Sequence, residues 1–507
     1  MKNKIFTISL LLLALLAISA VSASENVTDD AYSANQDNPE ADVLKQSDDT
    51  CPVMANDTSK VSSQLVSSKV KGYTTFPTTV SAKLTSNGKA ISSKPVKILL
   101  NKVTYVRTTD NKGIVSLNVM LSKGTYNAVF IFEGDDATNS STAKSKITIY
   151  DAIKTSIKQG DKYINYRQGS QCLFYAKLTD KNGKAIKNQM VTFKVSGKTY
   201  SAKTDRNGFA KIYLNLKKGT RKVTYSFKKT SPYLASSGSC KIKVKAKIAK
   251  GNGYWLWSSD MKRVNLKSLA KKGTKHIILH SQAVYQHGKS AVVSFIKKAH
   301  KNRIKVHLWM QIGYDGKKWY SFVNDNGKIK YSFFNKKLRE AKRLAKIRGV
   351  DGIHFDYIRY GGTAHNHPNA VESINYFSKK DSLAIHKIRP NCIVSAALMP
   401  EPKMMHYYYG QDVPTMSKYM DVLIPMVYKG NYHQKSSWIA SVTKTFVSQS
   451  NGAQIWTGLQ AYHSDNNAKK LTQKELLKDA RAAKTGGAAG IILFRIGISC
   501  NFNFKKV

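Results

Sequence analysis

The sequence is poor in several residue types, and each scarcity excludes a class of protein. Its 507 residues include five cysteines, too few for a scaffold held together by disulfides. Eleven prolines and 31 glycines exclude a collagen-like or proline-rich fibre. Only 31 acidic side chains face 82 lysines and arginines, which gives a formal net charge of +51. A charge of this size indicates a polyanionic partner: nucleic acid, an acidic membrane surface or an acidic polymer.

Long apolar runs are also scarce, and the strongest one lies at the N-terminus. Lys2 and Lys4 precede an apolar stretch over 5–18, and Val21-Ser22-Ala23 fits a cleavage site. This pattern predicts a secretory signal peptide over 1–23, and the alternative is an uncleaved anchor. No later stretch of about 20 residues is apolar, so no transmembrane segment is expected after cleavage. We therefore expect a secreted, extracellular or wall-associated protein, which argues against nucleic acid and favours an anionic wall polymer.

Residues 24–69 differ in composition from the rest of the chain. Before Thr50, eight acidic residues face one basic residue, Lys45, and Ser, Asn and Asp dominate. Such a segment cannot bury enough apolar surface to fold, so we predict a disordered acidic linker. The folded remainder is then even more basic than the total charge implies.

An internal repeat follows this linker. Asn87-Gly88-Lys89-Ala90-Ile91 recurs as Asn182-Gly183-Lys184-Ala185-Ile186, with one extra turn residue before the second copy. Short alternating runs between Asn-Gly and Lys-Gly turns predict antiparallel strands. We expect two all-β Ig-like sandwiches, over 70–150 and 151–247. These units resemble the immunoglobulin-like repeats of archaeal and bacterial adhesin-like surface proteins, and that resemblance implies a spacer rather than an enzyme.

The second unit contains two of the cysteines. Cys172 lies in its first expected strand and Cys240 in its last, so one sandwich could bring them together. A disulfide between them is plausible in an exported protein. Two free thiols are the alternative, because the first unit has no counterpart of this pair.

After residue 250 the pattern changes to short apolar strands alternating with basic amphipathic helices. Helices are expected over 291–302, 336–347, 373–388 and 473–484. Eight strands with helical connections predict a parallel (β/α)₈ TIM barrel over 252–507. An open, doubly wound sheet is the competing fold, but no glycine-rich phosphate loop follows the first strand. The expected strands are 254–259, 276–280, 305–311, 352–357, 393–399, 422–428, 454–460 and 490–495.

The C-terminal ends of barrel strands carry the functional residues of such enzymes. Alternation in the third strand turns Leu308 and Met310 toward the helices and Trp309 into the barrel. The same alternation turns His354 and Asp356 inward in the fourth strand. Acids that precede a strand, such as Asp351 and Asp421, belong instead to the opposite, stabilising face.

Acids, aromatic rings and amides gather at this rim, a combination that suits a sugar. Aromatic faces stack on sugar rings, amides and arginines bind hydroxyls, and two carboxyl groups can cleave a glycosidic bond. Asp356 and Glu401 end adjacent strands, and we expect them to be the catalytic pair, with Asp465 in reserve. Asp260 is as readily a loop cap as a ligand. The expected substrate-binding residues are Trp257, Trp309, Gln311, His354, Arg359, Tyr428, Gln460, Tyr462 and Arg495.

No cofactor and no metal are expected. His365, His367 and His406 could be metal ligands, but their loops offer no carboxylate partner at helical spacing. A solvated loop is therefore the preferred interpretation of these histidines.

The segment 349–360 resembles the fourth-strand signature of glycoside hydrolases with a (β/α)₈ barrel. Asp351-Gly352-Ile353-His354-Phe355-Asp356-Tyr357-Ile358-Arg359-Tyr360 is similar to their pattern D-G-I-H-x-D-Y-x-R-Y-P, with Gly361 in place of the proline. The segment is also similar to the D-G-x-x-x-D of family 18 chitinases, in which a glutamate follows two positions later. Ile358 stands at that position, and Lys429 replaces the aspartate of their sixth-strand motif. The resemblance implies polysaccharide hydrolysis, without the substrate-assisted mechanism of chitinases.

Together these patterns predict a secreted, wall-associated glycoside hydrolase acting on a polysaccharide, with pseudomurein as a substrate suggested by analogy. Retention and inversion of configuration both stay open. The main alternative is a non-catalytic adhesin that binds glycans through its barrel and Ig-like modules. A wall peptidase would need a nucleophile–base pair or a zinc site, and neither is evident in the sequence.

Overall fold

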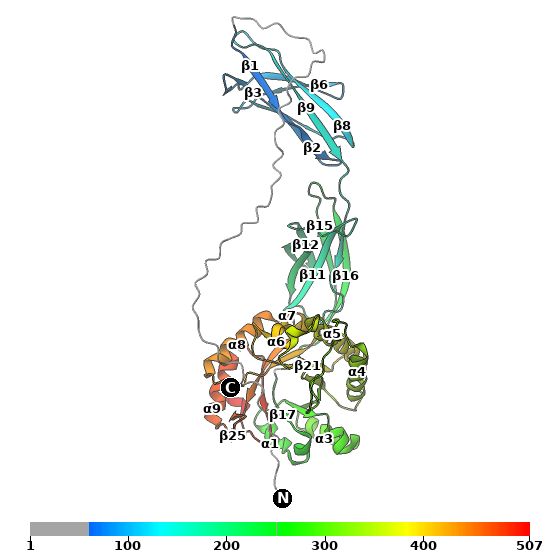
Figure 1. The fold of residues 1–507 in the computed structure, drawn as a ribbon, viewed down its shortest axis with the longest axis vertical. Coiled ribbons are helices and arrows are strands. Elements are labelled where there is room, and N and C mark those ends of the chain that lie inside the picture. The colour runs from blue at the N-terminus through cyan, green and yellow to red at the C-terminus, as the bar shows by residue number, and fades with distance from the viewer. Residues whose placement is uncertain (1–59, 250) are drawn as a thin grey trace.

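The computed structural model describes residues 60–249 and 251–507, and it shows two β-sheet modules in line with a barrel (Figure 1). The predicted signal peptide, most of the predicted linker and Cys51 lie outside these residues. The linker prediction needs one correction, because β1 (Ser63–Ser67) falls inside 24–69. This strand pairs with β3 (Thr78–Ser86) and buries Leu65. Within the described ranges, no helix has the length and apolarity of a membrane span.

The first module consists of two sheets that enclose one apolar core. In β3, Val80, Ala82 and Leu84 face this core, because alternate side chains of a strand point to one face. One sheet contains β1, β3, β4 (Lys89–Ala90) and β7 (Ile114–Val119). The other contains β2 (Val70–Tyr73), β9 (Ser141–Tyr150), β8 (Gly124–Phe132), β5 (Pro95–Leu100) and β6 (Val103–Thr108).

The second module repeats the strand pairing of the first. In the first module Thr85 pairs with Ala90 across a turn, and in the second Thr179 pairs with Ala185. The second turn is therefore one residue longer than the first. The internal sequence repeat is therefore also a structural repeat, whereas the Ig-like assignment stays a prediction. One sheet contains β10 (Thr155–Gln159), β11 (Cys172–Asp180) and β14 (Phe209–Leu214). The other contains β13 (Lys198–Lys203), β12 (Met190–Val195), β15 (Gly219–Phe227) and β16 (Ser236–Val244).

Of the two alternatives for this cysteine pair, the structure has the free thiols: no disulfide joins Cys172 and Cys240. Cys172 belongs to the sheet of β10, β11 and β14, whereas Cys240 belongs to the opposite sheet. The Cys172 sulfur lies 3.8–3.9 Å from backbone carbonyls of the loop over 165–170. The thiol therefore packs against its own loop rather than bonding to the other sheet.

The C-terminal region forms a closed barrel of eight parallel strands, which confirms the predicted topology over the doubly wound alternative. Helices surround it (Figure 1). The barrel strands are β17 (Asn252–Leu256), β18 (His276–His280), β19 (Lys305–Gln311), β20 (Gly352–Asp356), β21 (Ile393–Leu398), β22 (Val422–Pro425), β23 (Gln454–Gln460) and β26 (Gly490–Phe494). The helices are α1 (Leu266–Lys271), α2 (Ala283–Gln286), α3 (Gly288–Lys301), α4 (Tyr331–Ala345), α5 (Ala370–Ile388), α6 (Met405–Tyr409), α7 (Val413–Tyr419), α8 (Ser436–Gln449) and α9 (Gln473–Thr485).

Large aromatic side chains pack in the barrel interior. Leu308 and Met310 of β19 pack in the layer between barrel and helices, whereas Trp309 belongs to the separate interior cluster, as the alternation predicts. Trp255 and Trp456 occupy this interior with it. The filled barrel leaves its C-terminal rim as the place for chemistry.

The second module docks on the opposite, N-terminal face of the barrel. Asp421, which precedes β22, accepts hydrogen bonds from Asn165 Nδ2 at 2.7 Å and from the guanidinium of Arg167. A second contact joins Tyr419 to Asp161, with an O–O distance of 2.6 Å. Because the module covers the N-terminal face, the rim at the C-terminal ends of the strands stays open.

Candidate active site

Asp356 ends β20 and lies at the inner rim with 7% of its surface exposed. Trp309 Nε1 donates to its Oδ2 at 3.1 Å, and the Tyr357 backbone N–H donates to its Oδ1 at 2.7 Å. Burial raises the pKa of Asp356, although these donors and the charge of Arg359 oppose the rise. Because both oxygens accept from N–H groups, the carboxyl group is arranged as an acceptor rather than as a proton donor.

Glu401 lies just beyond β21, between Pro400 and Pro402. Its Oε1 accepts hydrogen bonds from the hydroxyls of Tyr432, at 2.6 Å, and Tyr409, at 3.2 Å. Its Oε2 is buried and has no hydrogen-bond partner among the described residues. Burial raises the pKa of Glu401, and the two tyrosine hydroxyls only reduce that rise. The unpartnered oxygen is therefore the position at which a proton can reside.

Arg359 links these two acids electrostatically. Its positive charge lowers the pKa of Asp356 and of Glu401, so the guanidinium lies within reach of both. Its Nε is buried and has no hydrogen-bond partner among residues 60–249 and 251–507. One of the five N–H groups of this guanidinium is therefore unused by the described residues, and the side chain as a whole is only partly buried.

Three aromatic rings hold this guanidinium. Its central carbon lies 4.5 Å from the ring centroid of Trp319, 5.2 Å from that of Tyr357 and 5.6 Å from that of Tyr409. Gly361 makes room for Trp319, because a Cβ at this position would lie 2.8 Å from the indole ring. A proline at this position would bring its own Cβ against the same ring. Tyr357 has a φ of 51°, a left-handed conformation that is uncommon for tyrosine and concentrates at functional sites.

A second part of the rim comes from the first and last barrel strands. The Trp257 ring lies 4.9 Å from that of Trp309, and the Arg495 guanidinium lies 5.7 Å from the Trp257 centroid. Arg495 also donates to Asp260 Oδ2 at 3.2 Å, so Asp260 is bound within the rim rather than acting as a simple loop cap. Trp257 is partly exposed and can offer a face to a ring, whereas Trp309 is 2% exposed and positions Asp356.

A third part follows strands β22 and β23. Tyr462 donates to Asp465 Oδ1 at 2.6 Å, and Gln460 Nε2 donates to Asn431 Oδ1 at 2.8 Å. Burial raises the pKa of Tyr428 far above its usual value, and Tyr462, Asp356 and Asp465 add to this effect. Asp465, the reserve candidate, therefore lies close enough to the site to affect the pKa of Tyr428. Its side chain is nevertheless exposed and accepts a hydrogen bond from Asn431.

The position of His354 does not fit the expected contact with a substrate. Its ring is fully buried, accepts a hydrogen bond from Trp255 Nε1 at 3.2 Å, and lies 3.0 Å from Ser395 Oγ through Nδ1. Burial lowers its pKa to about 3, so the ring is neutral. The inward direction was predicted correctly, but His354 lies beneath Asp356 and supports the rim from inside. Gln311 lies at the partly exposed end of β19.

The two departures from the chitinase pattern have structural roles. Ile358 is fully buried in the core between barrel and helices. Lys429 turns to Asp479 of α9 with an N–O distance of 2.7 Å. Neither position supplies a carboxyl group to the rim.

Two of the three histidines considered as metal ligands, His365 and His367, stack on tyrosines instead. The rings of His365 and Tyr407 are parallel with centroids 4.4 Å apart, and those of His367 and Tyr360 are 4.9 Å apart. Across residues 60–249 and 251–507, no group of three or more candidate ligands is placed to hold a metal ion.

Three residues of the site are not predicted from the ends of the barrel strands. Tyr409 and Tyr432 bind Glu401, and Trp319 holds Arg359, but all three lie in or beyond the loops that follow the strands. The run Tyr407-Tyr408-Tyr409, which begins six residues after Glu401, is the signal in the sequence that points to Tyr409. Tyr407 and Tyr408 are 44% and 39% exposed, so they extend an aromatic surface beside the pair.

No family model matches the sequence, and no curated protein matches it. Among solved structures, the chain is similar to the C-terminal domain of a candidate chitinase from Desulfitobacterium hafniense DCB-2, with 14% identity over 50% of this chain and 96% of that one and a TM-score of 0.38. It is similar to a GH18 chitinase from Cycas revoluta, with 11% identity, 49% and 95% coverage and a TM-score of 0.39. Fibronectin(III)-like modules of Clostridium thermocellum CbhA show 17% identity, 35% and 90% coverage and a TM-score of 0.24.

Proposed function

We propose that the protein is a glycoside hydrolase that cleaves a polysaccharide with Asp356 and Glu401. The observation that carries this proposal is the contrast between two buried acids at the ends of adjacent strands. Asp356 has donors on both oxygens, whereas Glu401 has donors on one and a free Oε2. Glycosidic cleavage needs this asymmetry, because one carboxyl group must give a proton and the other must act as an anion.

In this mechanism Glu401 is the general acid. It gives the proton on Oε2 to the leaving glycosidic oxygen, and the hydroxyls of Tyr409 and Tyr432 then stabilise the carboxylate that remains. Asp356 stays ionised and either attacks the anomeric carbon or activates water. A separation of about 5 Å between the two carboxyl groups would favour retention and about 6.5–9.5 Å inversion.

The sugar chain is bound by aromatic faces and hydrogen-bonding groups around the pair. Trp257, Trp319 and Tyr428 are partly exposed, and Arg359 and Arg495 have donors for hydroxyls. We also propose that the protein is secreted and stays at a cell wall, with an anionic polymer such as pseudomurein as its partner. The basic composition supports attachment, and the open rim beyond the docked modules supports access to a polymer.

The test uses the full chain and isolated wall polysaccharide, with reducing ends as readout. Wild type should release them, and Asp356→Asn should reduce release about 10³-fold or more. Asp351→Asn is the matched control, because Asp351 precedes the same strand and binds His300 and the Val306 N–H at the other face. Equal release by wild type and Asp356→Asn would remove Asp356 from the mechanism.

A glycan-binding adhesin is the second candidate function. The exposed rings of Tyr407 and Tyr408 favour it, since an aromatic platform binds sugar without any catalytic acid. Binding of wall glycan that persists in Asp356→Asn and Glu401→Gln, with no release by wild type, would support this candidate over the hydrolase.

A further inference from the structure

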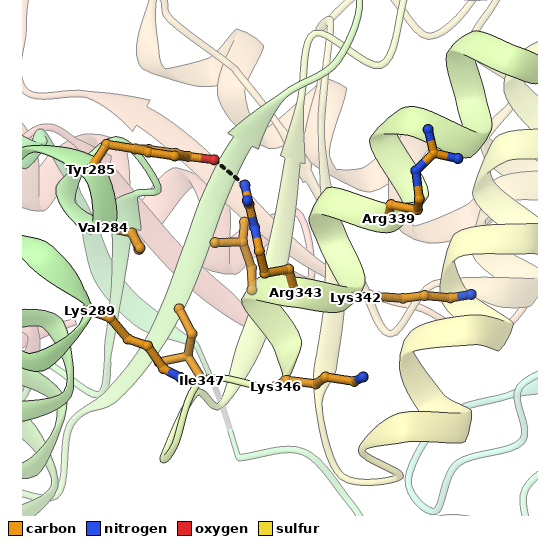
Figure 2. Close-up of a pocket in the computed structure, with 9 residues that line it drawn as sticks. Val284, Tyr285, Lys289, Arg339, Lys342, Arg343, Lys346 and Ile347 are labelled. Carbon is orange, nitrogen blue, oxygen red and sulfur yellow. Dashed lines mark hydrogen bonds between the residues drawn. The ribbon is translucent and has the colours of Figure 1, made fainter.

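A basic groove lies on the outer wall of the barrel, on helices rather than at the rim (Figure 2). It has a volume of about 570 Å³ and runs between α2, the start of α3 and the second half of α4. Five of its nine lining residues are cations and none is acidic. The lining residues are Val284, Tyr285, Lys289, Arg339, Lys342, Arg343, Leu344, Lys346 and Ile347.

No carboxylate among the described residues pairs directly with the cations of this groove. Within the part of the chain that the structure describes, none of the five forms an ion pair, although eleven other pairs are present. On α4, Arg339 and Arg343 lie four residues apart, as do Lys342 and Lys346. Like charges at this spacing destabilise a helix by about 0.2–0.5 kcal/mol per pair. Glu340, three residues before Arg343, and Asp381, which interacts electrostatically with Lys342, offset only part of this charge, so a bound anion would stabilise the helix further.

The helix dipole accounts for only part of this arrangement. Lys342 and Arg343 lie in the last turn of α4, where a cation is favourable. Lys289 lies in the first turn of α3, where the dipole disfavours a positive charge. Arg339 lies before the last turn of α4 and is exposed. The helix dipole therefore does not explain the presence of positive charges at Lys289 and Arg339.

An exposed aromatic ring accompanies the charges. Tyr285 is 56% exposed, and the Arg343 guanidinium lies 5.5 Å from its ring centroid and donates to its hydroxyl. Figure 2 shows Arg343 turned toward Tyr285 and Lys289 beside Ile347, whereas Lys342 and Lys346 extend along the opposite flank of α4. The centre of the groove thus combines two cations, one ring and an apolar floor.

We propose that this groove binds an acidic polysaccharide, with Lys289 and Arg343 on its carboxylates and Tyr285 against a sugar ring. The guanidinium fork matches the two oxygens of a carboxylate. A single ring favours a glycan over single-stranded nucleic acid, because nucleic-acid grooves stack successive bases on several aromatic side chains. The groove is separate from Asp356 and Glu401, so it would hold the polymer whether or not the rim cleaves it.

The test measures binding of polygalacturonate to the full chain at about 0.1 M salt, where long-range surface charge is largely screened. We expect Lys289→Gln/Arg343→Gln to bind about tenfold or more weakly. The matched control is Lys194→Gln/Lys243→Gln, which removes the same charge from exposed strands of the second module. The control should change affinity less than twofold, and unchanged thermal unfolding should show that both variants fold. An equal loss in both variants would overturn the proposal in favour of diffuse charge.

Two further arms identify the ligand class. Tyr285→Ala should weaken polygalacturonate binding while the salt dependence stays that of wild type, because the stacked ring carries no charge. A neutral glucan should bind at least tenfold more weakly than polygalacturonate, and equal binding would overturn the role of the cations. Tighter binding of a single-stranded oligonucleotide, lost in the double variant, would reassign the groove to nucleic acid.

Discussion

Asp421 at the N-terminal face of the barrel and Glu401 at its C-terminal rim are held in opposite ways. At the N-terminal face, Asp421 accepts from Asn165 and Arg167 on Oδ1 and from His386 and the Val394 N–H on Oδ2. At the C-terminal rim, Glu401 accepts only on Oε1. Burial raises the pKa of both, but the charges of His386 and Arg167 outweigh it and hold the pKa of Asp421 well below its usual range. The pKa of Glu401 stays raised. Burial alone therefore does not mark a functional acid, and the supply of partners separates the two cases.

The largest expected effect tests the rim side of this comparison. Glu401→Gln removes the proton donor, and we expect hydrolysis of polysaccharide to fall by about 10²–10⁴-fold. An aryl glycoside with a good leaving group needs little protonation, so its hydrolysis should fall much less. The measurement is the ratio of kcat/KM for the two substrates, and the folded state is checked by thermal unfolding.

Asp356→Asn is the partner control for this experiment. It should lower both rates alike, because the anion is needed whatever the leaving group. If Glu401→Gln also lowered both rates equally, Glu401 would not be the acid.

The next effect tests the N-terminal face. Asp421→Asn leaves Arg167 buried without its carboxylate, and we expect a loss of about 3–5 kcal/mol in the free energy of unfolding. Because the folded pKa is depressed, this contribution is present at neutral pH and disappears as the pH falls below about 4. Denaturant unfolding at several pH values measures it. The rate of hydrolysis per folded molecule should not change. A loss of activity without a loss of stability would contradict the assignment of Asp421 to a stabilising face and of the rim to catalysis.

The sequence predicts the barrel well because of how parallel strands are buried. β18, β19 and β23 have the predicted bounds, since strands covered on both faces appear as short apolar runs between turns. The second β-module was also recognisable from its repeat. Alternation gave the correct inward direction of His354 but not its depth, because a period of two carries no information about distance from the rim.

The rest of the site depends on tertiary contacts that no local pattern encodes. Tyr432 reaches Glu401 across 31 positions of sequence. The cysteines show the same limit: Cys172 and Cys240 lie in predicted strands, but strand order within the chain does not say which sheet each strand joins.

A smaller effect tests how hydroxyl donors act at the two faces. Tyr432→Phe removes a donor that favours the ionised form of Glu401, so the pKa of Glu401 should rise further. A general acid works only while protonated, so the alkaline limb of the pH–rate profile should move to higher pH, with a loss of up to about tenfold at the optimum. Tyr419→Phe removes the same kind of bond, to Asp161 at the N-terminal face. That control should leave the profile unchanged, and an identical shift in both variants would contradict a local effect on Glu401.

The smallest effect asks whether an unsatisfied acid is enough to indicate function. Asp381 of α5 is 1% exposed and its Oδ1 has no partner in the described chain, like Glu401 Oε2, but it lies between helices near Lys342. Burial raises its pKa well above the usual value. A raised folded pKa means that stability is lost as the pH rises, so Asp381→Asn should stabilise the protein at pH 8 by about 1–3 kcal/mol and have little effect near pH 4. Hydrolysis should not change at either pH. A large loss of activity in Asp381→Asn would show that a buried, unpartnered acid can affect hydrolysis without lying at the rim.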